Sequence, residues 1–145
     1  MKKMKRMGKK GYTLVELMVV VTVMAILAAT ATGIYTGYIE KAKSAAVLNT
    51  ARQVKEALMV CEAEYLAGDH EDEDLYWNDA FLKAPNHPDS ILYPYVGEVT
   101  ADCTNYTLKI GKDDNGVQYI KGFIYETDKY SAKWIKGEEI QVTKK

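Results

Sequence analysis

The side chains that most often catalyse reactions or bind metals are sparse in this chain and are not grouped. His70 and His87 are the only histidines, and neither stands at ligand spacing from another histidine or a cysteine. No serine lies in a nucleophile motif. The acidic pair Asp113 and Asp114 does not match a twelve-residue calcium loop, and a plain hairpin turn explains it. We therefore predict no enzymatic activity, no cofactor and no metal site.

Glu16 is the ionisable residue whose position demands a function. It lies near the start of an otherwise apolar run from Leu14 to Ile34. As a helix, this run spans about 30 Å, the thickness of the hydrocarbon core of a bilayer. A carboxylate there costs about 2.5–3.5 kcal/mol even on the lenient insertion scale, and charges inside membrane segments usually serve a function. Glu16 therefore needs a partner.

A basic flank precedes the apolar run. It predicts a single-pass membrane protein whose N-terminus stays in the cytoplasm and whose residues after Ile34 face outside. Without this flank the chain is acidic, which argues against nucleic acid as its main partner. The basic residues of the flank are Lys2, Lys3, Lys5, Arg6, Lys9 and Lys10.

An ordinary secretory signal is the first alternative, because Ala28 to Ala31 could form a small-residue cleavage site. Two features oppose it. The apolar run is longer than the roughly 7–15 residues of such a signal, and Glu16 lies inside it. A disposable signal has no reason to carry that carboxylate.

The segment Gly11-Tyr12-Thr13-Leu14-Val15-Glu16-Leu17, between the basic flank and the apolar run, resembles the type III signal of type IV prepilins and their pseudopilin relatives. Tyr12 departs from the phenylalanine that this family most often has, but it keeps the aromatic character. The resemblance covers about 25 residues.

The resemblance implies how the chain is processed and assembled. A membrane-embedded prepilin peptidase would cut between Gly11 and Tyr12, and the new N-terminus at Tyr12 would be methylated. Glu16 would then neutralise the α-amino group of Tyr12 in a neighbouring subunit. The implied partners are further copies of the chain, related minor pilins, and an inner-membrane assembly platform with its ATPase. Membrane lipid surrounds the helix before assembly.

One helix is predicted from about Thr13 to Ala67, because no proline precedes Pro85 and Gly68 is a suitable helix stop before an acidic loop at 69–74. Its second half is amphipathic and should complete the core of the residues that follow. The apolar stripe consists of Val47, Ala51, Val54, Leu58, Cys61 and Tyr65.

Beyond the helix we predict a helical turn at 79–83, an irregular proline-containing connection to Cys103, and an antiparallel meander of three or four strands. The strands are expected at 106–110, 117–125, 129–135 and 139–142, with a turn at 113–116. The fold class is therefore α+β, a long N-terminal helix packed on a small antiparallel sheet, as the resemblance to pilins also implies. The predicted divisions are 1–11 (leader), 12–34 (membrane or filament-core helix), 35–67 (amphipathic half) and 68–145 (globular head).

Two further features have competing interpretations. Gly33 weakens the helix and is a candidate hinge, or else a point of close helix packing. Cys61 and Cys103 are the only cysteines, and an exported head makes a disulfide between them the simplest interpretation. Two separate buried thiols are the alternative.

The expected function is a structural subunit of a surface pilus used for adhesion or twitching motility. A pseudopilin of a type II secretion or DNA-uptake system is the runner-up. A signal-anchored binding module of another class would remain uncut at Gly11.

Overall fold

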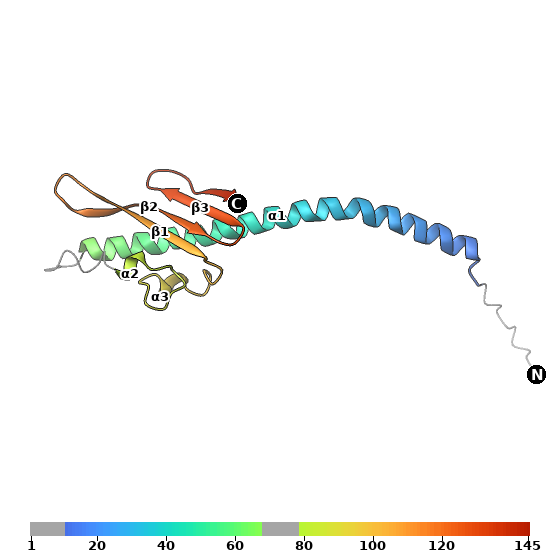
Figure 1. Ribbon diagram of the computed structural model, residues 1–145, viewed down its shortest axis with the longest axis horizontal. Coiled ribbons are helices and arrows are strands. Elements are labelled where there is room, and N and C mark those ends of the chain that lie inside the picture. Colours follow the sequence, from blue (N-terminus) through green and yellow to red (C-terminus); the bar gives the residue numbers. More distant parts are fainter. Residues whose placement is uncertain (1–10, 68–78) are drawn as a thin grey trace, which may run out of the picture. The chain divides into compact units, whose positions relative to one another are not determined.

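The computed structural model describes residues 11–67 and 79–145. The basic flank, the predicted helix stop at Gly68 and the acidic loop at 69–74 lie outside the described residues. The chain divides into two compact units, Met1–Glu40 and Lys41–Lys145. The elements in chain order are α1 (Leu14–Ala67), α2 (Asp79–Leu82), α3 (Tyr93–Val96), β1 (Asn105–Lys112), β2 (Gln118–Glu126), β3 (Tyr130–Ile135) and β4 (Gln141–Lys144) (Figure 1).

The first half of α1 is apolar, and its hydroxyl groups are satisfied within the helix. The Oγ1 atoms of Thr22 and Thr32 donate to carbonyl oxygens one turn earlier, each at 2.8 Å. Thr30 Oγ1 donates in the same way to Leu27 at 2.9 Å. Such bonds let threonine occur in a helix that has no water around it.

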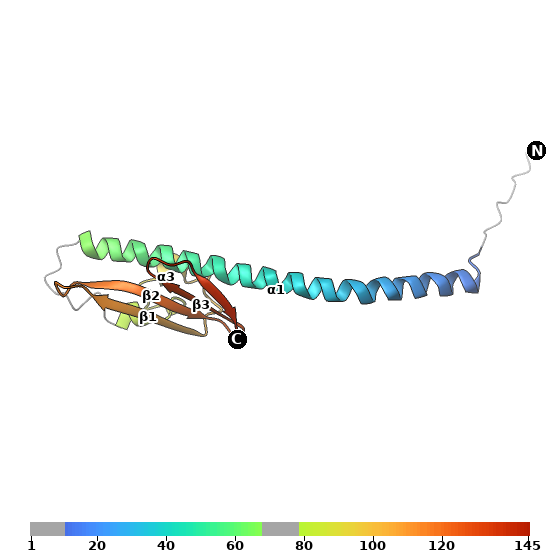
Figure 2. The same ribbon diagram turned by 90° about the horizontal axis from the view of Figure 1, so that it is seen from above.

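The second half of α1 packs on the sheet, which confirms the predicted α+β fold. The predicted stripe is buried from Val47 to Cys61, and Ala57 joins it. The side chain of Tyr65 is not among those described. Figures 1 and 2 show this half of α1 running along one face of the sheet. The sheet therefore lacks a core of its own on this face, and the helix supplies half of it.

The sheet is an antiparallel meander in the order β1-β2-β3-β4. Alternate residues of each strand point into the core, as the period of two requires. The predicted strands are confirmed, but the last one lies at 141–144 instead of 139–142. The inward side chains of the first three strands are Tyr106, Leu108, Ile120, Phe123, Tyr125, Tyr130, Ala132 and Trp134.

The turn between β1 and β2 is closed by Asp113, whose Oδ1 accepts from the backbone N–H groups of Asn115 at 2.9 Å and Val117 at 2.8 Å. The carboxylate is thereby used within the hairpin, as the hairpin interpretation predicts. A bulge between Lys109 and Ile110 shifts the register of the same hairpin. Near it, Gly122 is required by space, since a Cβ there would overlap the carbonyl oxygen of Trp134.

The connection before the sheet contains α2, as predicted, and also α3, which was not predicted. Pro94 lies in the first turn of α3, where a missing N–H costs no helical hydrogen bond. The end of the connection is pinned to β2, because Tyr125 Oη donates to Asp102 Oδ1 at 2.6 Å. Burial and this carboxylate raise the pKa of Tyr125.

An ion pair with a buried carboxylate and a half-exposed lysine joins α1 to the sheet. Glu62 is only 8% exposed, and its Oε1 accepts from the backbone N–H of Ile120 at 2.9 Å. Lys136 Nζ lies 3.1 Å from both carboxylate oxygens. We call these three residues the Glu62 clamp.

Candidate cleavage and assembly site

The predicted cleavage bond lies in a short non-helical segment immediately before α1. Gly11, Tyr12 and Thr13 precede the first helical residue, Leu14. Tyr12 is 88% exposed, and a Cβ built at Gly11 would meet no atom within 4 Å. Exposed non-helical backbone beside a small residue is the kind of segment that proteases cut. The Gly11–Tyr12 bond is therefore accessible.

Thr13 and Glu16 form a capping box at the start of α1. Glu16 Oε2 accepts from the backbone N–H and from the hydroxyl of Thr13, both at 2.9 Å. In return Thr13 Oγ1 accepts from the backbone N–H of Glu16 at 3.3 Å. Each residue thus satisfies a donor that the first turn of a helix leaves without an intrahelical partner.

The capping box uses one of the two carboxylate oxygens. Within residues 11–67 and 79–145, both bonds from Thr13 end on Oε2, and no hydrogen bond reaches Oε1. A carboxylate has lone pairs for about four donors. With respect to the described residues, Oε1 can therefore accept from a further donor.

The helix that follows this site is suited to a bilayer. α1 is the helix in the described part of the chain that is long and apolar enough to cross a membrane, and none of its most apolar 18-residue window is buried. The core helix of a soluble protein would be largely buried. Side chains such as Leu17, Val20 and Ile26 are instead about half exposed or more. A membrane anchor fits this exposure.

Residues 6–32 match the family model of the prokaryotic N-terminal methylation motif. This chain carries the type IV prepilin signal motif. The prepilin signal covers Gly11, Tyr12, Thr13 and Glu16, the same residues that border the accessible bond and form the capping box. No curated protein and no solved structure matches the chain. The head is therefore described by its own structure alone.

Gly33, the predicted hinge, lies just beyond the matched motif and is helical. A Cβ there would meet nothing within 4 Å, and the same holds at Gly37. Gly37 was missed at the sequence level although it lies one turn further along the same face. The segment of α1 with low helix propensity therefore contains two glycines, Gly33 and Gly37.

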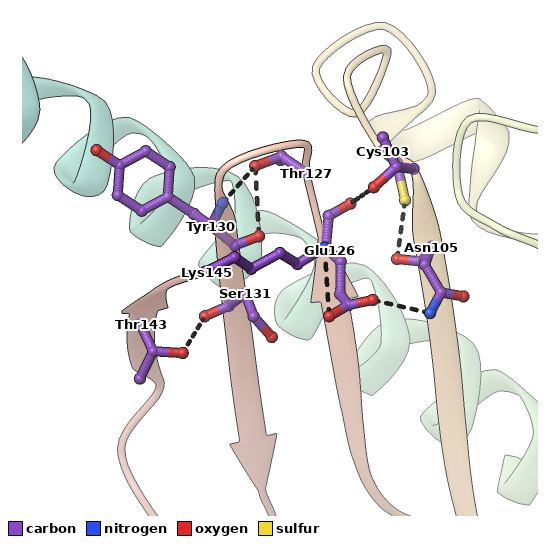
Figure 3. A network of polar contacts seen from close by, with 9 residues as sticks. Cys103, Asn105, Glu126, Thr127, Tyr130, Ser131, Thr143 and Lys145 are labelled. Carbon is purple, nitrogen blue, oxygen red and sulfur yellow. Dashed lines mark hydrogen bonds and ion pairs between the residues drawn. The ribbon is translucent and has the colours of Figure 1, made fainter.

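The predicted disulfide is not confirmed, because Cys61 and Cys103 are both free in the structure. Cys61 is buried on the inner face of α1, whereas Cys103 is half-buried just before β1. Cys103 Sγ donates to the carbonyl oxygen of Asn105 at 3.4 Å (Figure 3). Burial raises the pKa of each thiol to about 11. The structure thus corresponds to the alternative of two separate thiols.

Thr13 is the site residue whose contribution sequence reasoning missed. Its signal was present, since a threonine three residues before a glutamate at the head of an apolar run predicts a capping box. The cost of a buried charge predicts an oppositely charged partner for Glu16, whereas the structure supplies a neutral partner within the same chain.

Proposed function

We propose that the chain is a structural subunit of a type IV pilus-like filament. Prepilin peptidase cuts it after Gly11, the new N-terminus at Tyr12 is methylated, and the subunits bundle through their apolar helices. The heads then form the outer surface of a filament at the cell surface. The match of residues 6–32 to the methylation motif supports this proposal most strongly.

In the proposed filament, Glu16 pairs with the α-amino group of Tyr12 in a neighbouring subunit. The open Oε1 atom supports this pairing, because an amine can approach it without displacing Thr13. A charge alone in an apolar core is costly, and an opposite charge at hydrogen-bond distance offsets much of that cost. The pairing would therefore favour one axial register of neighbouring helices.

Replacing Glu16 by glutamine tests the pairing. Glutamine can still accept from Thr13 in a capping box, but it has no charge to pair with an amine. Glu16→Gln should be inserted and cleaved like the unchanged chain, and the yield of sheared filament should fall about tenfold or more. Glu16→Ala should assemble as poorly, while Glu64→Ala, an exposed position further along α1, serves as the control. Filaments at normal yield from Glu16→Gln would refute the pairing.

The intact mass and N-terminal peptide of material sheared from cells test the function itself. An abundant species beginning at methylated Tyr12 is the expected result. A cleaved species confined to the membrane would instead favour the alternative, a pseudopilin of a secretion or DNA-uptake system. An uncut chain in the sheared material would contradict the proposal.

A further inference from the structure

Glu16 exists in two chemical situations during the life of the proposed subunit, and the amine is present in only one of them. Before the cut, the nitrogen of Tyr12 is part of the peptide bond to Gly11 and carries no charge. The apolar helix must nevertheless enter the membrane before assembly. The carboxylate of the uncut chain therefore needs a partner other than the amine of a neighbouring Tyr12.

The structure of the uncut chain contains such a partner. Thr13 bonds to Glu16 Oε2 through both its N–H and its hydroxyl, each at 2.9 Å. Glu16 is the only polar side chain between Thr13 and Thr22, so no other residue of this segment can share the task. The two residues lie within one helical turn, so the hydrogen bonds between them form when the helix forms.

We infer that Thr13 is the positioning residue of Glu16 in the uncut precursor, which rests on the proposed cleavage after Gly11. Its hydroxyl and N–H hold Oε2 while the helix enters the bilayer, so the carboxylate is inserted with hydrogen bonds already made. Both bonds end on Oε2, so among the described residues Oε1 keeps its lone pairs for another donor. The atom proposed to receive the amine is thus set in place before the cut creates that amine.

The inference is tested in cells that lack the prepilin peptidase, so that only the full-length precursor accumulates. The variants are Thr13→Val, which keeps the shape and removes the hydroxyl, and Thr13→Ser, which restores the hydroxyl. Two quantities are measured. The first is the amount of precursor that resists alkaline extraction from membranes, and the second is the half-life of the precursor after protein synthesis is stopped. Thr22→Val is the matched control, because the Thr22 hydroxyl donates to the carbonyl of Met18 and makes no bond to Glu16.

We expect Thr13→Val to lower the extraction-resistant precursor about fivefold, the effect of losing one helix cap. Thr13→Ser should restore it, and Thr22→Val should leave it unchanged. In a Glu16→Ala background the effect of Thr13→Val should shrink, because the residue acts through the carboxylate. Normal precursor levels for Thr13→Val, or an equal loss with and without Glu16, would overturn the inference.

The outcome is separable from that of the proposed function. Assembly does not occur without the peptidase, so the precursor assay reports only on Thr13 and Glu16 before the cut. If Glu16→Gln assembles normally in cells that have the peptidase, the proposed pairing fails while the precursor result still stands.

Discussion

The two cysteines show how burial sets the chemistry of a single residue type. Cys61 is enclosed by the core between α1 and the sheet, and Cys103 is partly covered beside the network of Asn105 and Glu126 (Figure 3). Desolvation disfavours the thiolate, which is the reactive form. The neighbouring carboxylates Glu64 and Asp102 add to the effect at Cys61 and Cys103 respectively.

Alkylation should therefore be slow and strongly dependent on pH. With each thiol pKa raised to about 11, only about a thousandth of the thiol is ionised at pH 8. Iodoacetamide should modify both cysteines about a hundredfold more slowly than a model peptide thiol, and the rate should rise about tenfold per pH unit up to about pH 11. Mass spectrometry of the full chain in detergent measures both rates, and Cys103 should react first because it is less buried.

The pH dependence of stability has the same origin. The unfolded thiols lose protons near pH 8.5, before the folded ones, so folding stability should fall from about pH 8.5 to about pH 11. If neither cysteine is alkylated at any pH until a reductant is added, the chain holds the Cys61–Cys103 disulfide instead.

At the scale of the elements, the Glu62 clamp attaches α1 to the sheet through polar contacts. Glu62 satisfies the buried N–H of Ile120 and pairs with Lys136, whose side chain is 47% exposed. Hydrophobic packing alone is non-directional. A bidentate contact of this kind fixes the position of α1 along the strands.

Removing the carboxylate should destabilise the head. Glu62→Ala leaves the Ile120 N–H buried without a partner, which costs about 1–3 kcal/mol. Lys136→Met should cost less, about 0.5–1 kcal/mol, because the lysine is half exposed and Ile120 keeps its acceptor. Urea unfolding of the full chain in detergent, followed by near-ultraviolet circular dichroism, measures both. A loss for Lys136→Met equal to that for Glu62→Ala would show that the ion pair, not the bond to Ile120, supplies the stability.

Periodicity predicted the strands and the second half of α1, because these segments place apolar residues at the periods that burial requires. It predicted neither α3 nor the clamp. Three prolines favoured an irregular connection, but Pro94 occupies a helical position that tolerates it. Glu62 resembles an ordinary surface charge in sequence, since its partners Ile120 and Lys136 lie far along the chain. Such long-range partners are properties of the folded state and leave no local pattern.

At the scale of the whole molecule, one helix belongs to two compact units with different surroundings. The described residues from 11 to 38 are exposed, whereas the part of α1 after Lys41 contributes buried residues to the core that it shares with the sheet. Gly33 and Gly37 lie just before this boundary. A Cβ added at either glycine would meet nothing within 4 Å, so packing within the described chain does not require glycine at either position.

Substitutions of these glycines distinguish the hinge from close helix packing. Changing both to alanine adds about 2 kcal/mol of helix propensity and only two methyl groups. If the region unwinds on assembly, as the hinge interpretation requires, Gly33→Ala/Gly37→Ala should lower the filament yield severalfold while cleavage and membrane insertion stay normal. We expect this result.

Gly33→Leu decides the alternative, because leucine is a good helix former that also blocks a close approach of another helix. Under close packing, the double alanine variant should assemble nearly normally and Gly33→Leu should not assemble. Under a hinge, both should be impaired, since each raises helix propensity. The yield of sheared filament relative to cleaved subunit in the membrane measures the difference, and a double alanine variant at full yield would exclude the hinge.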